Sequence, residues 1–480
     1  MNSRRPLPHH QNPGNRTSWW GRHSAWLWPL VCSTAVALAL AQQSDIIIKL
    51  AGGERAVLAV PDFRGAGAAQ SQMDAFNQTL WSDLEESGLF KMAPKTMYPL
   101  EPPQRPQDFR PPKLPAASPR RGERPKPVRQ GPWLTDWSDP PVSANYLAFG
   151  YTAEQAGGLV LFGNFYNVTQ ADLANARVLG KLYFGTLDEA GARKVAHEFA
   201  SDILAQFGFK NLAGTKIYFD SDRTGHKEIW VMDSDGSNQK PLTSYMSLSI
   251  MPAVSPDSAR LAFTTYLRGN PSIMMHSLTT GGRLVFYNQN ASMNATLDFS
   301  PDGKQLVYSS TAAGGYAQLY IANVDGSDLR RLSRSRSIDI EPKINPKTGA
   351  QIAFVSDRSG TPQIYRMNLD GADVERLTSG EGDAVNPAWH PDGQHLAFAW
   401  TKGFAPGNFN IFIMDVATRE VNQLTHGAGR NENPNWAPDG RHLAFSSNRS
   451  GGSQIFTMLV DGTRVRQLTT QGRNARPVWK

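Results

Sequence analysis

"NPNWAPDGRHLAFSSNRSGGSQIFTMLVDGTRVRQLT", residues 433–469, is the stretch that decides the fold. It divides into four short apolar segments separated by turn signals: Pro-Asn-Trp, Leu-Ala-Phe, Ile-Phe-Thr-Met and Arg-Gln-Leu-Thr. The Pro-Asp-Gly and Asp-Gly sequences between them tolerate the positive φ angles that tight hairpins need. The stretch therefore predicts one unit of four antiparallel strands.

Similar units recur from residue 214 to the end of the chain. The second segment of each copy ends in an aromatic residue, and successive ends are 44, 45, 46, 44 and 47 residues apart. These ends are Phe219, Phe263, Tyr308, Phe354, Phe398 and Phe445. Six four-stranded units at this period predict a six-bladed β-propeller. A solenoid is the alternative, but four strands per unit and the paired glycine turns favour radial packing.

The two ends of the repeat array complement each other. The first copy, "KIYFDSDRTG", starts at its second strand, and no Pro-x-Trp segment precedes it. The last eight residues, "RNARPVWK", supply a first strand with nothing after it. We therefore expect the C-terminal segment to become the inner strand of the first blade and to close the ring. The closing residues are Pro477, Val478 and Trp479.

An α/β pattern precedes the propeller. "ERAVLAVPDF", "NYLAFGY", "GLVLFGNFYNV" and "KLYFGT" are typical of strands. Two segments place apolar residues at helical spacing, namely Met73, Phe76, Leu80 and Leu84 in one and Val195, Phe199, Ile203 and Phe207 in the other. The pattern predicts an α/β N-terminal domain over 42–211 and the propeller over 212–480.

A proline-rich insertion at about 99–132 interrupts the N-terminal domain. Ten prolines lie between Pro99 and Pro127, and residues 101–130 hold eight Lys/Arg against three Asp/Glu. Five of the seven net positive charges of the chain thus belong to this segment, which argues against a nucleic-acid surface elsewhere. We expect a disordered or semi-rigid loop; a proline-rich docking ligand is the alternative.

Residues 1–41 have the features of a secretory signal peptide. Four arginines precede the apolar run "LWPLVCSTAVALALA", which ends in a small-x-small pattern and predicts cleavage after Ala41. A lipoprotein site at Cys32 fits less well, because Leu30 and Val31 precede it. A twin-arginine signal from Arg4 is a second, weaker alternative. The exported chain would then contain no cysteine, and neither disulfides nor thiol chemistry would contribute.

Enzymatic motifs are incomplete in this sequence. No Gly-x-Ser-x-Gly pentapeptide marks a hydrolase elbow. His197-Glu198 lacks the second histidine of a zinc helix, since Ser201 stands there. "DSDGS" from Asp233 lacks the late glutamate of a calcium loop and is better interpreted as a hairpin turn. We therefore expect no catalysis and no cofactor, while a weakly bound channel cation such as calcium stays open.

Several motifs together resemble one protein family. "VLAVPDF", "DLEESGLF" and "RKVAHEFASDI", followed by six Pro-x-x-Ser-Pro-Asp-Gly-like repeats, are similar to the TolB family of the Tol–Pal system. The resemblance covers most of the chain after the signal peptide. It implies a non-catalytic scaffold in the periplasm of a Gram-negative bacterium, monomeric when free, with roles in outer-membrane integrity and constriction during division.

The resemblance also implies partners and a binding site. A Pal-like peptidoglycan-associated lipoprotein would bind at the mouth of the propeller channel, and a TolA-like inner-membrane protein would contact the N-terminal region. Other outer-membrane or peptidoglycan-associated proteins are further candidates, and nucleic acid is not. The binding positions are expected in the loops ahead of each first strand: Met293, Asn294, Thr296, Ile340, Glu341, Asn386, Asn433 and Arg476.

A second function class stays open at the level of sequence. An exported propeller can also bind or hydrolyse peptides or glycans in its central channel. Turnover of such a substrate, lost on mutation of channel carboxylates, would favour this alternative.

Overall fold

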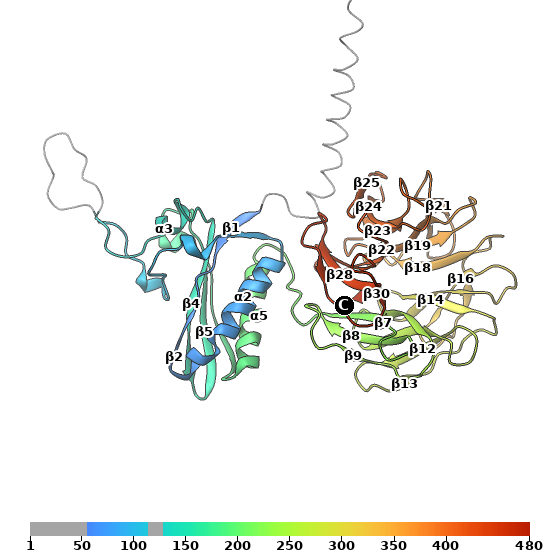
Figure 1. The fold of residues 1–480 in the computed structure, drawn as a ribbon, viewed down its shortest axis with the longest axis horizontal. Helices are drawn as coiled ribbons and strands as arrows, with labels where there is room; N and C mark the ends of the chain where they lie inside the picture. The colour runs from blue at the N-terminus through green and yellow to red at the C-terminus, as the bar shows by residue number, and fades with distance from the viewer. Residues whose placement is uncertain (1–54, 114–127) are drawn as a thin grey trace, which may run out of the picture.

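The computed structural model describes residues 55–113 and 128–480 (Figure 1). They form an α/β domain followed by a propeller, as the sequence predicted. The predicted signal peptide, its cleavage after Ala41 and the centre of the proline-rich insertion lie outside the described residues. Within those residues, no helix has the length and apolar character needed to span a membrane.

The N-terminal domain is built on a mixed sheet with the order β3-β1-β4-β5-β6, and β2 pairs β4. Strands β1, β3 and β2 run parallel to their partners, whereas β4, β5 and β6 form an antiparallel meander. The strands are β1 (Ala56–Ala59), β2 (Arg64–Ala66), β3 (Phe90–Met92), β4 (Tyr146–Gln155), β5 (Gly158–Asn167) and β6 (Arg177–Thr186).

Two amphipathic helices cover one face of this sheet (Figure 1). They are α2 (Met73–Glu86) and α5 (Glu189–Ala205), and their predicted apolar faces are buried in one core. His197 on α5 lies 2.7 Å from the Asp83 carboxylate on α2, an ion pair that raises the pKa of the histidine. The short helices are η1 (Gly67–Gln72), η2 (Lys95–Met97), η3 (Pro106–Asp108), α3 (Thr135–Ser138) and α4 (Leu173–Ala176).

The flanks of the proline-rich insertion pack on the opposite face of the sheet. Phe109 is buried there and stacks on Tyr166 with ring centroids 6.1 Å apart. Lys113 and Val128 exchange two backbone hydrogen bonds, which closes the base of the insertion. Residues 99–113 and 128–132 are therefore ordered, because buried aromatic area compensates for the conformational entropy that these flanks lose.

The propeller consists of six four-stranded antiparallel sheets, numbered here as blades 1–6. Blade 1 contains β30 (Asn474–Trp479), β7 (Lys216–Ser221), β8 (Glu228–Asp233) and β9 (Lys240–Pro241). Blade 2 contains β10 (Ser249–Val254), β11 (Arg260–Thr265), β12 (Ser272–Ser277) and β13 (Arg283–Leu284). Blade 3 contains β14 (Asn294–Phe299), β15 (Gln305–Ser310), β16 (Gln318–Asn323) and β17 (Arg330–Arg331).

The remaining blades follow the same order from the inner to the outer strand. Blade 4 contains β18 (Asp339–Ile344), β19 (Gln351–Ser356), β20 (Gln363–Asn368) and β21 (Glu375–Arg376). Blade 5 contains β22 (Ala384–Trp389), β23 (His395–Trp400), β24 (Asn410–Asp415) and β25 (Val421–Gln423). Blade 6 contains β26 (Asn431–Trp436), β27 (His442–Ser447), β28 (Gln454–Leu459) and β29 (Arg466–Gln467).

The C-terminal strand closes the ring, as predicted. β30 pairs antiparallel with β7, with Val478 opposite Tyr218 and Trp479 opposite Ile217, and the two lie side by side in Figure 1. The Trp479 ring is buried, and its Nε1 donates to Thr215 Oγ1 over 2.9 Å. Blade 1 thus joins the two ends of the repeat array.

The repeated polar residues hold the blades together. The threonine of Arg-x-Leu-Thr accepts a hydrogen bond from a backbone amide of the third strand; Thr469, for example, accepts from Ile455 at 2.9 Å. In three blades the turn after the second strand is fixed by an arginine that bonds the first residue of the inner strand. Arg358 in blade 4 donates to Asp339 Oδ1 over 2.8 Å and lies over the Tyr365 ring. These motifs therefore have structural roles.

The N-terminal domain contacts the turns of blade 6. Arg441, in the turn between the first two strands, is buried and donates to the backbone carbonyls of Ser87 and Gly88. His442 Nε2 lies 2.7 Å from the Glu86 carbonyl oxygen, and Arg466 pairs with the Glu86 carboxylate. The domain therefore rests on the face of the propeller where the inner strands end.

Removal of the closing strand tests the architecture. Trp479→Ala deletes a buried side chain and should lower the free energy of unfolding by about 3–5 kcal/mol, with a larger loss for deletion of residues 473–480. Chemical denaturation monitored by circular dichroism measures both. Gln471→Ala, at an exposed side chain just ahead of β30, is the control and should unfold like the wild type. A wild-type midpoint for the deletion would contradict closure by β30.

Candidate functional site: a polar channel through the propeller

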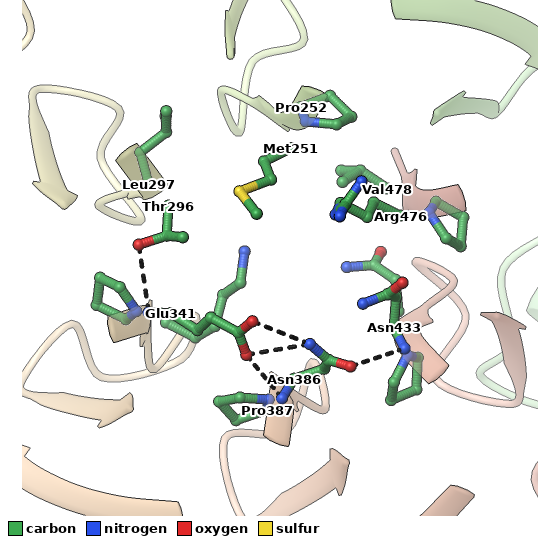
Figure 2. Close-up of a pocket in the computed structure, with 15 residues that line it drawn as sticks. Met251, Pro252, Thr296, Leu297, Glu341, Asn386, Pro387, Asn433, Arg476 and Val478 are labelled. Carbon is green, nitrogen blue, oxygen red and sulfur yellow. Dashed lines mark hydrogen bonds between the residues drawn. The ribbon is translucent and has the colours of Figure 1, made fainter. Parts of the chain in front are cut away.

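One residue from each inner strand points into the centre of the propeller (Figure 2). All six have positive φ angles between 46° and 57°, and each lies where the register of the inner strand shifts. Positive φ is uncommon outside glycine and costs about 1–3 kcal/mol per residue when the surrounding structure imposes it. The bulge turns these side chains toward the axis. In blade order 2–6 and then 1, they are Met251, Thr296, Glu341, Asn386, Asn433 and Arg476.

These six side chains line two adjoining cavities of about 90 Å³ and 390 Å³, which together we call the channel. All except Thr296 line both cavities. The larger cavity adds residues from the beginnings of inner strands and from nearby turns, including Lys227, Arg430 and Glu432. It therefore opens toward the end where the inner strands begin, opposite the face that contacts the N-terminal domain.

Hydrogen bonds link the channel residues from blade to blade. In three inner strands, the backbone amide of the channel residue donates to the channel side chain of the preceding blade. Thr296 Oγ1 accepts from the Glu341 amide over 3.3 Å, and Glu341 Oε2 accepts from the Asn386 amide over 2.8 Å. Asn386 Oδ1 accepts from the Asn433 amide over 3.2 Å. Figure 2 shows this series of bonds around one side of the channel.

The series continues to blade 1 through a serine hydroxyl. Ser446 Oγ accepts from the Arg476 amide over 3.0 Å and donates to Asn433 Oδ1 over 3.3 Å. The Arg476 guanidinium instead bonds the buried Asp220 carboxylate, which also pairs with Lys227 at 2.6 Å. Met251 has no side-chain acceptor of comparable strength. The channel therefore has a polar side over blades 3–6 and an apolar, cationic side over blades 1 and 2.

Glu341 is the carboxylate at the centre of the polar side. Burial in the channel wall raises its pKa, and the hydrogen bonds from Asn386 and the charges of Lys343 and Arg476 only partly offset this. Both carboxylate oxygens accept from the Asn386 side-chain amide at 3.1 Å. Burial thus disfavours the ionised form of the Glu341 carboxylate, and both of its oxygens already accept hydrogen bonds from Asn386.

The structure separates the eight predicted site residues into two groups. Thr296, Glu341, Asn386, Asn433 and Arg476 come together in the channel, although they lie within strands and not in the preceding loops. Met293, Asn294 and Ile340 do not line the channel. Asn294 is buried at the start of β14, where its side-chain amide donates to the backbone carbonyl of Gln289. Ile340 packs against the core of blades 4 and 5.

Sequence reasoning missed several polar or protruding lining residues, among them Met251, Lys227, Arg430 and Glu432. Met251 stands directly before Pro252, as Glu341, Asn386, Asn433 and Arg476 stand before their prolines, so the repeat alignment contained the signal. Lys227 and Arg430 come from turns, and Glu432 lies in β26 directly before Asn433. Arg430 and Glu432 form an ion pair at the mouth. No repeated motif marks these three positions.

The fold and channel together define a six-bladed propeller joined to an α/β domain, with a polar central cavity. The TolB beta propeller domain model matches residues 208–386 and 378–480, more than half of the chain. The chain therefore belongs to the TolB family, which confirms the resemblance seen in the sequence.

Individual relatives agree with this assignment. A TolB homolog of Chlorobium chlorochromatii is 34% identical over 216 residues, 45% of this chain and 46% of that protein. The Tol-Pal system protein TolB of Anaeromyxobacter dehalogenans is 30% identical over 314 residues, 65% of each chain. The matched region thus spans about half to two thirds of these relatives. The crystal structure of TolB from Acinetobacter baumannii has the same fold, with a TM-score of 0.70, 22% identity and coverage of 89% of this chain and 96% of that one.

The raised pKa of Glu341 predicts a pH dependence of stability. Because the folded pKa lies above the ordinary value of 4.5, the folded state binds the proton more tightly. The contribution of Glu341 to the unfolding free energy should therefore fall as pH rises from 4.5 through the folded pKa. Glu341→Gln cannot titrate, so its stability relative to the wild type should increase over that interval. Denaturant unfolding at a series of pH values measures this, with exposed Glu154→Gln as control; parallel curves for wild type and Glu341→Gln would contradict the prediction.

Proposed function

We propose that this protein is a non-catalytic scaffold of the Tol–Pal system, and that its channel mouth binds a Pal-like peptidoglycan-associated lipoprotein. Membership in the TolB family supports the proposal, as does a relative named as a Tol-Pal system protein. The observation that carries it is the convergence of one side chain from each of six blades on an open, polar cavity.

The position of the N-terminal domain supports binding at this mouth. Its contacts through Arg441, His442 and Arg466 lie on the face where the inner strands end. Within residues 55–113 and 128–480, the N-terminal domain therefore leaves the mouth where the inner strands begin uncovered. The N-terminal region would contact a TolA-like inner-membrane protein in this scheme.

The chemistry of the channel suits a protruding loop of a partner. Lys227, Arg430 and Arg476 offer cationic groups at the mouth, and Glu341 with the two asparagines offers amide and carboxylate groups deeper inside. A few convergent polar groups in a concave surface give orientation and specificity to a bound segment. A loop with a carboxylate or backbone carbonyls near its tip would complement the cationic groups.

The lining also supports a binding role over catalysis. Among the described channel residues, no histidine or cysteine lies beside a hydroxyl as a nucleophile and base would require. Glu341 is engaged by Asn386, and Glu432 is paired with Arg430. A channel cation such as calcium would have to compete with these bonds for the two carboxylates.

The predicted signal peptide complements this function. Export across the inner membrane would bring the protein to the periplasm of a Gram-negative bacterium. There it would link a lipoprotein of the outer membrane to Tol proteins of the inner membrane, with roles in envelope integrity and in constriction during division.

Charge reversal in the channel tests the binding site. Glu341→Arg places a bulky cation among Lys343 and Arg476 and should lower affinity for a purified Pal-like lipoprotein by at least about tenfold, or 1.4 kcal/mol. Titration calorimetry measures the affinity, and circular dichroism checks the fold. Glu154→Arg makes the same charge change on an exposed tip of the N-terminal domain and should bind normally. Equal affinity for both variants would overturn the proposed site.

A milder variant separates binding from folding. Met251→Ala removes apolar surface from the other side of the channel and leaves the hydrogen-bond series over blades 3–6 untouched. It should weaken the same complex severalfold.

A photo-crosslinker at position 433, used in the native cells, should capture a Pal-like lipoprotein. Reproducible capture of other proteins without it would contradict the proposed partner.

A further inference from the structure

A cluster of two histidines and a carboxylate lies outside the channel, in the turn between β22 and β23 of blade 5. One ligating atom each from His390, Asp392 and His395 lies within 4.8 Å of the others. His390 and His395 are 8% and 5% exposed, whereas Asp392 is half-buried and open to solvent on one side. Imidazole nitrogen and carboxylate oxygen are ligands of zinc and similar divalent metals.

The distances place the carboxylate between the two imidazoles. His390 Nδ1 lies 2.9 Å from Asp392 Oδ1, and His395 Nδ1 lies 2.8 Å from Asp392 Oδ2. Ligand atoms of a tetrahedral zinc ion are roughly 3.4 Å apart for bonds of about 2.1 Å. Small shifts of side chains would therefore let all three residues contact one ion.

The tautomer of His390 leaves Nδ1 without a proton. Its Nε2 lies 2.9 Å from the Gly440 carbonyl oxygen and must donate to it, and the Asp392 amide approaches Nδ1 at 3.1 Å as a donor. The single Nδ1 lone pair accepts from that amide and also lies 2.9 Å from a carboxylate oxygen, so a metal ion at Nδ1 would replace the amide as its partner. A cation between His390 Nδ1 and the Asp392 carboxylate oxygen would replace this contact between two acceptors with two coordination bonds.

His395 has a matching arrangement. With Nδ1 directed at Asp392, its buried Nε2 has no hydrogen-bond partner, although the Asp415 carboxylate is 3.7 Å away. Metal-bound histidines usually donate their second N–H to a carbonyl or carboxylate. Coordination through Nδ1 would require a proton on Nε2, directed toward Asp415.

Other blades show what the turn needs without a metal. In blade 6, Asp439 and His442 repeat the aspartate–histidine pair at 2.6 Å, but Ala437 stands in place of His390 and His442 Nε2 meets the Glu86 carbonyl. In blades 2 and 3 a serine occupies the place of His390 and donates to the turn aspartate; Ser300 Oγ lies 2.6 Å from Asp302. The turn therefore forms without a histidine at this position.

We propose that His390 Nδ1, His395 Nδ1 and the Asp392 carboxylate form a binding site for a divalent transition metal, with zinc as the best match. The fourth position faces solvent beside Asp392. The Gly440 carbonyl in blade 6 and Asp415 in β24 orient the two imidazoles. The ion would join the turn of blade 5 to blade 6, and its role would be structural.

His390→Ser tests the site, because serine supports the same turn in blades 2 and 3. The full chain, without a polyhistidine tag and freed of metal by chelation, is titrated with Zn²⁺ against a chromophoric chelator. The wild type should bind one more equivalent than His390→Ser, or bind it at least about 100-fold more tightly. Zn²⁺ should raise the melting temperature of the wild type and leave that of His390→Ser unchanged.

Two further measurements test whether the metal binds at this site and not at another histidine. His426→Ser removes an exposed histidine of the same blade and should retain the site. Co²⁺ should give the wild type a visible absorption band of tetrahedral nitrogen and oxygen coordination, absent from His390→Ser. Equal Zn²⁺ binding by wild type and His390→Ser would overturn the proposal. So would NMR evidence of a doubly protonated His390 that does not respond to Zn²⁺, because a proton would then fill the place assigned to the ion.

Discussion

The pairing of β30 with β7 is the constraint on which the rest of the structure depends. Each inner strand of the propeller is held by its own blade and by the blades on either side, so a missing inner strand would expose two neighbouring cores. Val478 and Trp479 fill the first blade and bury apolar area between blades 6 and 2. The same strand brings Arg476 to the axis. The same strand pairing therefore closes the ring and completes the lining of the channel.

The channel side chains also stabilise the backbone of the propeller. The six side chains protrude because the inner strands bulge into an unfavourable backbone conformation, and the amides freed by the bulges are satisfied by neighbouring side chains. Such strain persists only where surrounding bonds enforce it. A partner that competes for Asn386 or Asn433 would also act on the backbone of the next blade.

The repeats made most of the fold predictable. Strands that end in an aromatic residue every 44 to 47 residues, Asp-Gly turns and the terminal Pro-Val-Trp segment each have a local physical meaning. The channel residues were only partly predictable. Thr296, Glu341, Asn386, Asn433 and Arg476 follow from repeat position, but the difference between a loop and a bulged strand depends on backbone geometry that no motif encodes. Asn294 and Asn386 are the same type of residue. Asn294, however, lies two positions before the channel residue of its strand and is buried at the start of β14. Phe109 shows the same limit: in a proline-rich, charged segment, only the tertiary fold reveals the aromatic cluster that holds it.

The bonds around the channel all run in one direction. Thr296, Glu341 and Asn386 each accept from the backbone amide of the channel residue in the following blade, and Asn433 is linked to Arg476 through the Ser446 hydroxyl. A change at Glu341 alters the main chain at Asn386, 45 residues later in the sequence, while the main chain at Thr296 keeps its own contacts. The series starts at Thr296 and ends at Arg476, and Met251 lies between its two ends. The propeller backbone repeats six times around the axis, but the hydrogen-bond series begins in one blade and ends in another. A ligand in the channel would therefore meet different donors and acceptors at different blades.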